Sequence, residues 1–151
     1  GRKVIVLGID PGNAVSGVVR FDGTRVLFAG VIDNPDVLKI IADDRSDVLA
    51  IELFVATNQR LGTESIETIH WGGRFQQASG DPDSVVLVPR LQVKRALGLS
   101  QRDGDKEVNA RLAAIVGPKG TKSAPGPCFG VSSHSWAALG CAYAALKMLE
   151  A

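Results

Sequence analysis

Two acidic residues end two of the most apolar runs in this sequence. Asp10 closes the run VIVLGID, directly before Pro11 and Gly12, and Glu52 closes the run DVLAIE. Each run is typical of a buried strand, and carboxylates are almost never buried unless they are paired. A divalent cation is the natural partner for two such carboxylates. Either acid alone has an ordinary explanation, since Asp-Pro-Gly also ends strands as a turn and Glu52 could be a satisfied interior charge.

A mixed sheet is expected to position these acids. The spacing of apolar runs and turn residues predicts strands over 3–10, 15–21, 25–31, 48–52 and 84–88. The first three should form an antiparallel meander, because Asp22-Gly23 is a hairpin signal, and the others should add parallel strands. In an α/β sheet a ligand tends to lie beyond the carboxyl ends of the parallel strands, where Asp10 and Glu52 are predicted.

Helices are predicted to flank this sheet. The sequence indicates a short helix opening at Asn34-Pro35 and further helices over 63–77, 91–97, 104–116 and 133–151. The expected N-cap residues are Asn34, Thr63 and Ser133. The adjacent Gly72 and Gly73 should interrupt the second helix, and the Pro- and Gly-rich segment 117–130 is expected to be a mobile loop. The last helix is apolar on nearly every side and should pack deeply on the sheet.

Composition favours one ordinary globular domain over 1–151. The chain is 45% hydrophobic and 22% charged, and no stretch reaches the roughly 20 apolar residues of a membrane span. A cytoplasmic protein is therefore expected. Cys128 and Cys141 fit neither a disulfide framework nor a zinc spacing, which predicts free thiols. The initial Gly1 in place of Met suggests trimming or truncation of the chain.

The formal net charge of +1 hides an asymmetry along the chain. Residues 1–89 carry 8 Lys/Arg and 12 Asp/Glu, whereas residues 90–122 carry 8 Lys/Arg and 3 Asp/Glu. The basic block consists of Arg90, Lys94, Arg95, Arg102, Lys106, Arg111, Lys119 and Lys122. These residues could form a face that follows nucleic-acid phosphates beside an acidic metal centre, or simply a solvated helix surface.

Four sequence segments form a further pattern along the chain. They are GIDPG at 8–12, AIE at 50–52, LQVKRALGL at 91–99 with DKEV at 105–108, and SSHSWAALGCA at 132–142. Together they resemble the RuvC-type Holliday junction resolvases of the ribonuclease H-like superfamily. Their order and spacing match over nearly the whole chain, although each segment alone is unremarkable. The resemblance implies a ribonuclease H-like α/β fold and a homodimeric endonuclease that cuts four-way DNA junctions by metal-dependent paired nicks.

The resemblance also implies roles for particular residues. Asp10, Glu52 and His134 would bind Mg²⁺ or Mn²⁺, as two ions about 3.5 to 4 Å apart that activate water and stabilise the leaving oxygen. Lys94 and Lys106 would contact or polarise the scissile phosphate. The residues expected to bind DNA are Phe54, Arg90, Lys94, Arg95, Lys106, Lys119 and Lys122.

One position departs from the pattern of this family. The last helix should open with a His or Asp ligand and carry a carboxylate three positions later, on the same helix face. His134 fills the first position, but Ala137 stands where an aspartate is expected. Ala137 could replace a native Asp, the lineage could have lost catalysis, or Asp103 or Asp105 could supply the missing oxygen. His134 could also be no more than a cap residue.

Aromatic residues near the predicted site have two interpretations each. Phe54 is close to the place of an aromatic wedge that inserts at the junction centre in the family, one residue out of register, and could equally be a core side chain. The segment 70–75 contains His70, Trp71, Arg74 and Phe75. These side chains could stack on nucleic acid or pack in a dimer interface, and the resemblance favours the interface.

Three other functional classes fit parts of the sequence. A nucleotide-binding domain of the actin or sugar-kinase superfamily also opens with a strand and an Asp, but it needs two lobes and a second phosphate loop. A non-catalytic module that binds branched nucleic acid would need neither metal nor a carboxylate at position 137. Another ribonuclease H-like nuclease would differ in its substrate alone.

Overall fold

Five strands form one sheet in the computed structural model, which describes residues 2–56 and 60–151. The strands are β1 (Val6–Asp10), β2 (Val15–Phe21), β3 (Val26–Asp33), β4 (Val48–Leu53) and β5 (Val86–Pro89). The helices are α1 (Asn34–Asp43), α2 (Thr63–Ala78), α3 (Arg90–Ala96), α4 (Asp105–Val116) and α5 (Ser135–Glu150), with a 3₁₀ turn at Pro82–Ser84. Among these helices none is long and apolar enough to cross a membrane.

The strand order is β3-β2-β1-β4-β5. The pairs β1–β2 and β2–β3 are antiparallel, and the pairs β1–β4 and β4–β5 are parallel. The sheet is therefore the predicted mixed sheet of a three-strand meander plus two parallel strands. Because β1, β4 and β5 all point the same way, their carboxyl ends meet at one edge of the sheet.

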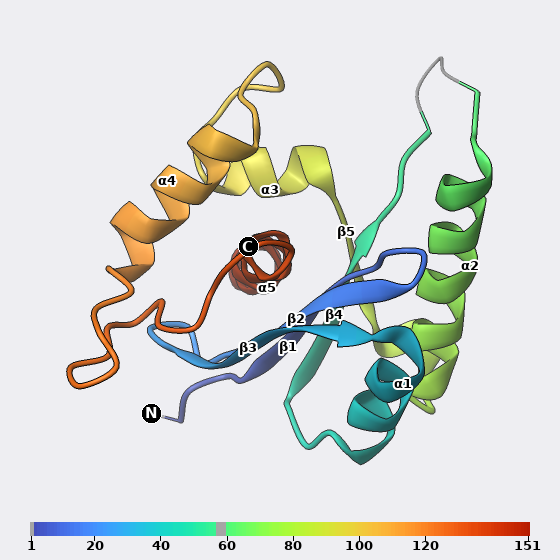
Figure 1. The fold of residues 1–151 in the computed structure, drawn as a ribbon, viewed down its shortest axis with the longest axis horizontal. Coiled ribbons are helices and arrows are strands. Elements are labelled where there is room, and N and C mark those ends of the chain that lie inside the picture. The colour runs from blue at the N-terminus through green and yellow to red at the C-terminus, as the bar shows by residue number, and fades with distance from the viewer. Residues whose placement is uncertain (1, 57–59) are drawn as a thin grey trace.

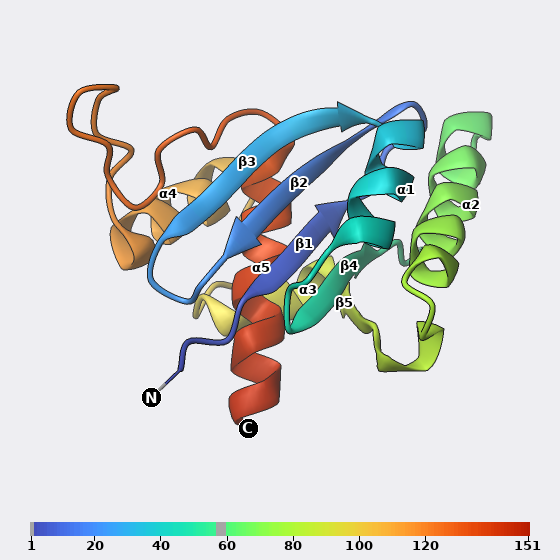
Figure 2. The ribbon, with the colours of Figure 1, turned by 90° about the horizontal axis from the view of Figure 1, so that it is seen from below.

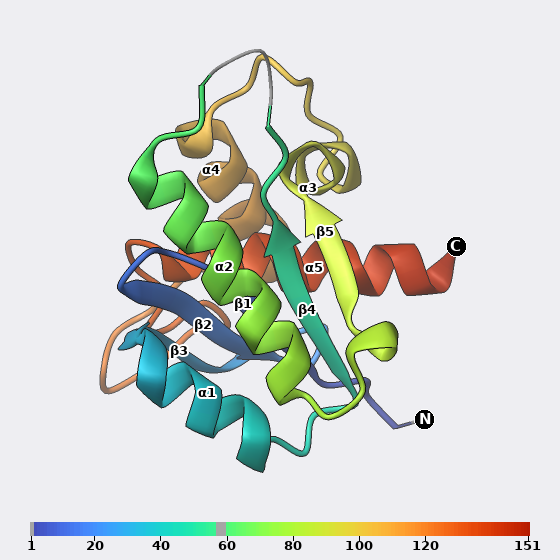
Figure 3. The ribbon, with the colours of Figure 1, turned by 90° about the vertical axis from the view of Figure 1, so that its right-hand side faces the viewer.

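Helices cover both faces of the sheet (Figure 1). Helix α5 lies against one face with α3 and α4 outside it, while α1 and α2 cover the opposite face, as the turned views also show (Figures 2 and 3). The core on the α5 face includes Val6, Val19, Val88, Leu112 and Leu139. The core on the other face includes Leu7, Ile9, Ile51, Val37 and Phe75. The last helix is thus as deeply packed as its sequence predicts.

Two glycines let α5 approach the sheet closely. A Cβ atom on Gly8 of β1 would lie 2.6 Å from the carbonyl oxygen of Ala138, and one on Gly17 of β2 would overlap the carbonyl oxygen of His134. Neither contact is tolerable between real atoms, so the backbone of α5 rests where these side chains would otherwise be. This approach fixes the start of α5 beside the carboxyl end of β1.

We expect Gly17→Ala to lower the free energy of unfolding by about 1–3 kcal/mol, as overpacking of a filled core does. Gly73→Ala is the matched control, because nothing lies within 4 Å of a Cβ at this position of α2. Alanine is the better helix former by up to about 1 kcal/mol, so the control should be neutral or stabilising. Urea denaturation of both variants measures the difference, and equal stabilities would contradict the close approach of α5.

Several local expectations were wrong. The N-cap positions are Asp33, Gly62 and His134 rather than Asn34, Thr63 and Ser133, and none makes a side-chain cap hydrogen bond. Asn34 is instead buried, where its Oδ1 accepts a 2.6 Å hydrogen bond from Ser16.

The glycine pair at 72–73 does not interrupt α2, which runs unbroken through both residues. Phe75, on the next turn, is fully buried against the sheet and Trp71 packs on the same cluster. This burial outweighs a cost of about 1 kcal/mol for each glycine.

Candidate functional site

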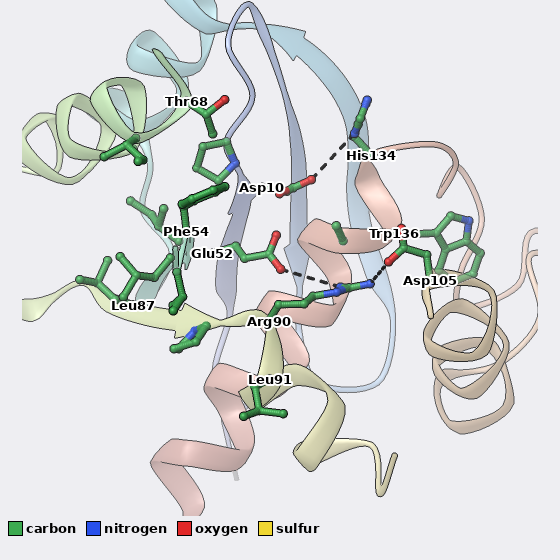
Figure 4. A pocket seen from close by; sticks show the side chains of 18 of the residues that line it. Asp10, Glu52, Phe54, Thr68, Leu87, Arg90, Leu91, Asp105, His134 and Trp136 are labelled. Carbon is green, nitrogen blue, oxygen red and sulfur yellow. Dashed lines mark hydrogen bonds and ion pairs between the residues drawn. The ribbon is translucent and has the colours of Figure 1, made fainter. Parts of the chain in front are cut away.

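Asp10 and Glu52 lie side by side at the carboxyl ends of β1 and β4. The parallel register pairs Ile9 with Ile51, so the next residue of each strand is also a neighbour. Side chains alternate along a strand, and Gly8 and Ala50 face α5. Both carboxylates therefore point to the α5 face of the sheet, into one cavity (Figure 4). The structure brings together the two acids that the strand pattern singled out.

Glu52 is the more perturbed of the two acids. Its burial, and then the neighbouring Asp10 carboxylate, raise the pKa of Glu52 from 4.5 to about 9, while the Arg90 guanidinium opposes the shift. The Oε1 atom of Glu52 is buried and has no hydrogen-bond partner among the described residues. An orphaned carboxylate oxygen beside a second carboxylate is the environment that a bound cation would relieve.

Arg90 is the nearest cation to these acids within the described chain. Its Nη1 atom lies 3.8 Å from Glu52 Oε1, and its Nη2 atom donates a 2.6 Å hydrogen bond to Asp105 Oδ1. The guanidinium thus stands between a carboxylate of β4 and one at the start of α4 (Figure 4). The sequence indicated Asp105 only as a possible source of oxygen, and this bridge was not anticipated.

The start of α5 borders the same site. His134 Nδ1 lies 3.9 Å from Asp10 Oδ2, and its side chain is 64% exposed. Ala137, one helical turn further along, also lines the cavity. A side chain at position 137 would therefore face the two acids, but a methyl group offers them no ligand.

Asp10, Glu52 and His134 are suitable ligand types for a hard divalent cation. The resemblance implies one further ligand, which Ala137 does not provide. Carboxylate oxygens and an imidazole are suitable ligands for Mg²⁺ or Mn²⁺. Over residues 2–56 and 60–151, however, no three His, Cys, Asp or Glu side chains are arranged to hold a metal. Asp10, Glu52 and the exposed His134 thus do not form a three-ligand cluster in this structure, and Ala137 beside them adds no ligand.

A cavity of about 1240 Å³ surrounds the acids. Its polar side carries Lys94, whose Nζ donates to the Gln101 carbonyl at 3.1 Å, together with Arg90 and Asp105. Its apolar side is lined by Leu53, Phe54, Val55, Ile69, Leu87 and Leu91. Trp136 and Asn109 also line the cavity and were not predicted, since their types and spacing carry no distinctive signal. Phe54 is 42% exposed and is therefore not a core side chain.

Other basic residues expected at DNA do not reach this cavity. Lys106 is exposed on α4, where the lining residues are Asp105 and Asn109, and Arg95 is exposed on α3. The loop that carries Lys119 and Lys122 is anchored elsewhere. The Val26 amide of β3 donates to the Pro127 carbonyl at 2.8 Å, and Val26 lies at the end of the sheet opposite to Asp10.

Two of the four residues singled out on α2, Trp71 and Phe75, pack within the protein. Phe75 is fully buried, and its ring centroid lies 5.7 Å from that of Trp71. Arg74 is exposed and stacks over the Trp71 ring at 4.1 Å, and His70 is exposed. Phe75 is thus unavailable for stacking on nucleic acid.

The comparisons with known proteins support the fold. No family model matches the sequence, and no curated protein matches it. A solved structure of Thermus thermophilus RuvC in complex with a Holliday junction substrate is similar over 97% of this chain and 95% of that chain, with a TM-score of 0.70 and 23% identity. Another Thermus thermophilus RuvC structure has the same coverages and identity and a TM-score of 0.68. The chain therefore has a RuvC-like, ribonuclease H-like α/β fold, as expected.

Proposed function

We propose that this protein, as one nuclease domain over 1–151, is a crossover junction endodeoxyribonuclease that resolves four-way DNA junctions inside a bacterial or phage-infected cell. The observation that carries the proposal is the pair Asp10 and Glu52, held side by side in an open cavity next to the start of α5. The RuvC-like fold supports the junction as substrate, because a solved neighbour binds one. The form described by this sequence is catalytically impaired, since Ala137 gives no carboxylate.

Asp10, Glu52 and His134 would hold Mg²⁺ or Mn²⁺ in this proposal. The ions, when bound, supply an activated water and charge stabilisation at phosphorus. The side chains of the protein position these ions. Asp10 and Glu52 fix the position of the charge on a rigid sheet edge.

Lys94 and Arg90 would orient the DNA backbone. Both line the cavity that contains the acids, and a positively charged group beside an acidic centre is required to bring a phosphate near two carboxylates. Phe54 is exposed at the same cavity and would insert at unstacked bases. Arg95, Lys106, Lys119 and Lys122 would contact the junction arms further out.

A homodimer is part of the proposal. Two nicks in a four-way junction require two active sites related by a two-fold axis. A surface suited to the contact lies at the start of α2, away from the cavity lining. The exposed apolar side chains there are Leu61, just before the helix, and Ile66 within it. Such a surface is more apolar than an ordinary solvated face and fits a partner of the same kind.

The direct test of this function is binding without catalysis. We expect the chain, in a chelator, to bind a four-way junction at least about tenfold more tightly than a linear duplex of the same sequence, a difference of roughly 1.4 kcal/mol. Lys94→Ala should weaken both complexes and reduce the salt dependence, because a phosphate contact is lost. Gel shift assays at several salt concentrations measure this. Equal affinity for junction and duplex would contradict the proposal.

A non-catalytic module that binds branched nucleic acid is the second candidate. The incomplete ligand set favours this candidate, because a protein that only binds DNA needs no metal site. The described residues contain no group of three metal-binding side chains, and position 137 is an alanine. It predicts junction binding without metal, and no gain of cleavage from a carboxylate at position 137.

A further inference from the structure

The two carboxylates beside Arg90 differ in their exposure to solvent. Asp105 is 85% exposed, while Glu52 is only 14% exposed. Ion pairs of exposed carboxylates are weak, because solvent screens the charges and two mobile side chains must be ordered. Arg90 itself is only 28% exposed, and its Nη1 atom is buried 3.8 Å from Glu52 Oε1, so packing holds the inner end of the guanidinium in place. Arg90 can therefore exchange its outer partner while its inner end stays beside Glu52.

The outer partner lies where a phosphate of the proposed substrate would enter. Asp105 and Lys94 line the same cavity as Arg90, Asp10 and Glu52. Arginine pairs with phosphate through two parallel hydrogen bonds, in the geometry that it also uses for carboxylate. A phosphodiester oxygen could thus occupy the place that Asp105 Oδ1 takes at Nη2 of Arg90.

We propose that Asp105 is an internal substitute for a DNA phosphate: it holds Arg90 in the free protein and releases it to a backbone phosphate when DNA binds. This inference rests on the proposed function, since it names how that site receives its substrate. Arg90 stays against Glu52 throughout, so the bound phosphate lies next to the acidic pair. Asp105 is consequently a competitor for Arg90 and not a replacement for the ligand missing at position 137.

A double-mutant cycle in a chelator tests the exchange. Asp105→Asn should tighten junction binding by about three- to tenfold, and Arg90→Gln should weaken it by a similar factor. In the Arg90→Gln background, Asp105→Asn should change the affinity for the junction by less than about twofold, because the guanidinium for which Asp105 competes with phosphate is then absent. Asp105 is exposed, so its substitution does not threaten the fold.

Asp103→Asn is the matched control for loss of charge. Asp103 lies two residues away and accepts hydrogen bonds from the Ser100 amide and hydroxyl, with no contact to Arg90 in the described structure. Its substitution removes the same charge and keeps an acceptor oxygen. An equal gain from Asp103→Asn, or an equal gain from Asp105→Asn with and without Arg90, would overturn the proposal, because simple repulsion between acid and DNA would explain both results.

A second measurement keeps the two proposals separable. The Nε–H signal of Arg90 can be followed by ¹⁵N NMR during titration with inorganic phosphate, and it should shift at lower phosphate concentration in Asp105→Asn than in the parent chain. If junction and duplex bind equally but Asp105→Asn still tightens both, the junction function fails and the exchange stands. If no DNA binds, the phosphate titration decides, and an Arg90 signal that responds identically in both proteins overturns the exchange.

Discussion

Replacement of Ala137 by aspartate should raise cleavage of a four-way DNA junction in Mg²⁺ by about a hundredfold or more. A metal ion stabilises the transition state at phosphorus by several kcal/mol, and each 1.4 kcal/mol or so corresponds to about tenfold in rate. Position 137 lines the cavity one helical turn from His134, so a carboxylate there would add a ligand beside Asp10 and Glu52 for the proposed ion. Denaturing gels of a labelled junction, beside a linear duplex, measure the paired nicks.

Ala137→Asn is the control for this gain, because it has the same shape but lacks the charge. We expect it to restore at most a small part of the activity. Isothermal titration with Mn²⁺ should show tighter metal binding for Ala137→Asp alone. Full activity of the parent chain with no gain from aspartate would contradict the impaired site. Absence of cleavage in both proteins, with tight junction binding retained, would favour the non-catalytic module.

The central pair of the site could be predicted because it depends on local pattern. Apolar runs identify strands, and an acid that ends such a run must lie at a strand tip. The parallel pairing of β1 and β4 then follows from the α/β order, and it places Asp10 next to Glu52. The departure at Ala137 was visible only through the resemblance, which implies a carboxylate three positions after the ligand that opens the last helix, on the same helix face.

The Arg90 bridge could not be predicted because no sequence period encodes it. Arg90 begins α3 and Asp105 begins α4, and the distance between them depends on how the turn at 97–104 folds. Arg90, Lys94 and Lys106 are equivalent as members of a basic block in the sequence. Only the packing of α3 and α4 separates the first two, which line the cavity, from Lys106, which does not.

Helix boundaries were predicted less well than strands for a related reason. Serine is a residue type that favours the N-cap position. Ser133, however, adopts a positive φ of 49°, and the helix begins two residues later. The carbonyl of His134 must fit against Gly17 of β2, so tertiary contact determines where α5 starts. Capping preferences of about 1 kcal/mol are too small to oppose that packing.

Glu52→Gln should remove most of the pH dependence of stability in the metal-free protein. The pKa of Glu52 is raised to about 9 in the fold by burial and by Asp10, so the folded state binds a proton that the unfolded state has already lost above about pH 4.5. Stability from this group is therefore complete at pH 4 and is lost as pH rises through about 9. The slope approaches about 1.4 kcal/mol per pH unit between these limits.

The glutamine side chain remains neutral at every pH, so the Glu52→Gln variant should be more stable than the parent chain at pH 8 in a chelator. In the Ala137→Asp background, the same substitution should abolish metal-dependent cleavage, because a proposed metal ligand is lost. Urea unfolding between pH 5 and pH 9 measures the effect, with the exposed Glu67→Gln on α2 as a control that leaves the slope intact. A parent chain whose stability rises over this range would contradict the raised pKa. The same carboxyl group thus opposes folding when it is ionised without metal and would bind the cation when metal is present, so metal should stabilise the parent chain most at alkaline pH.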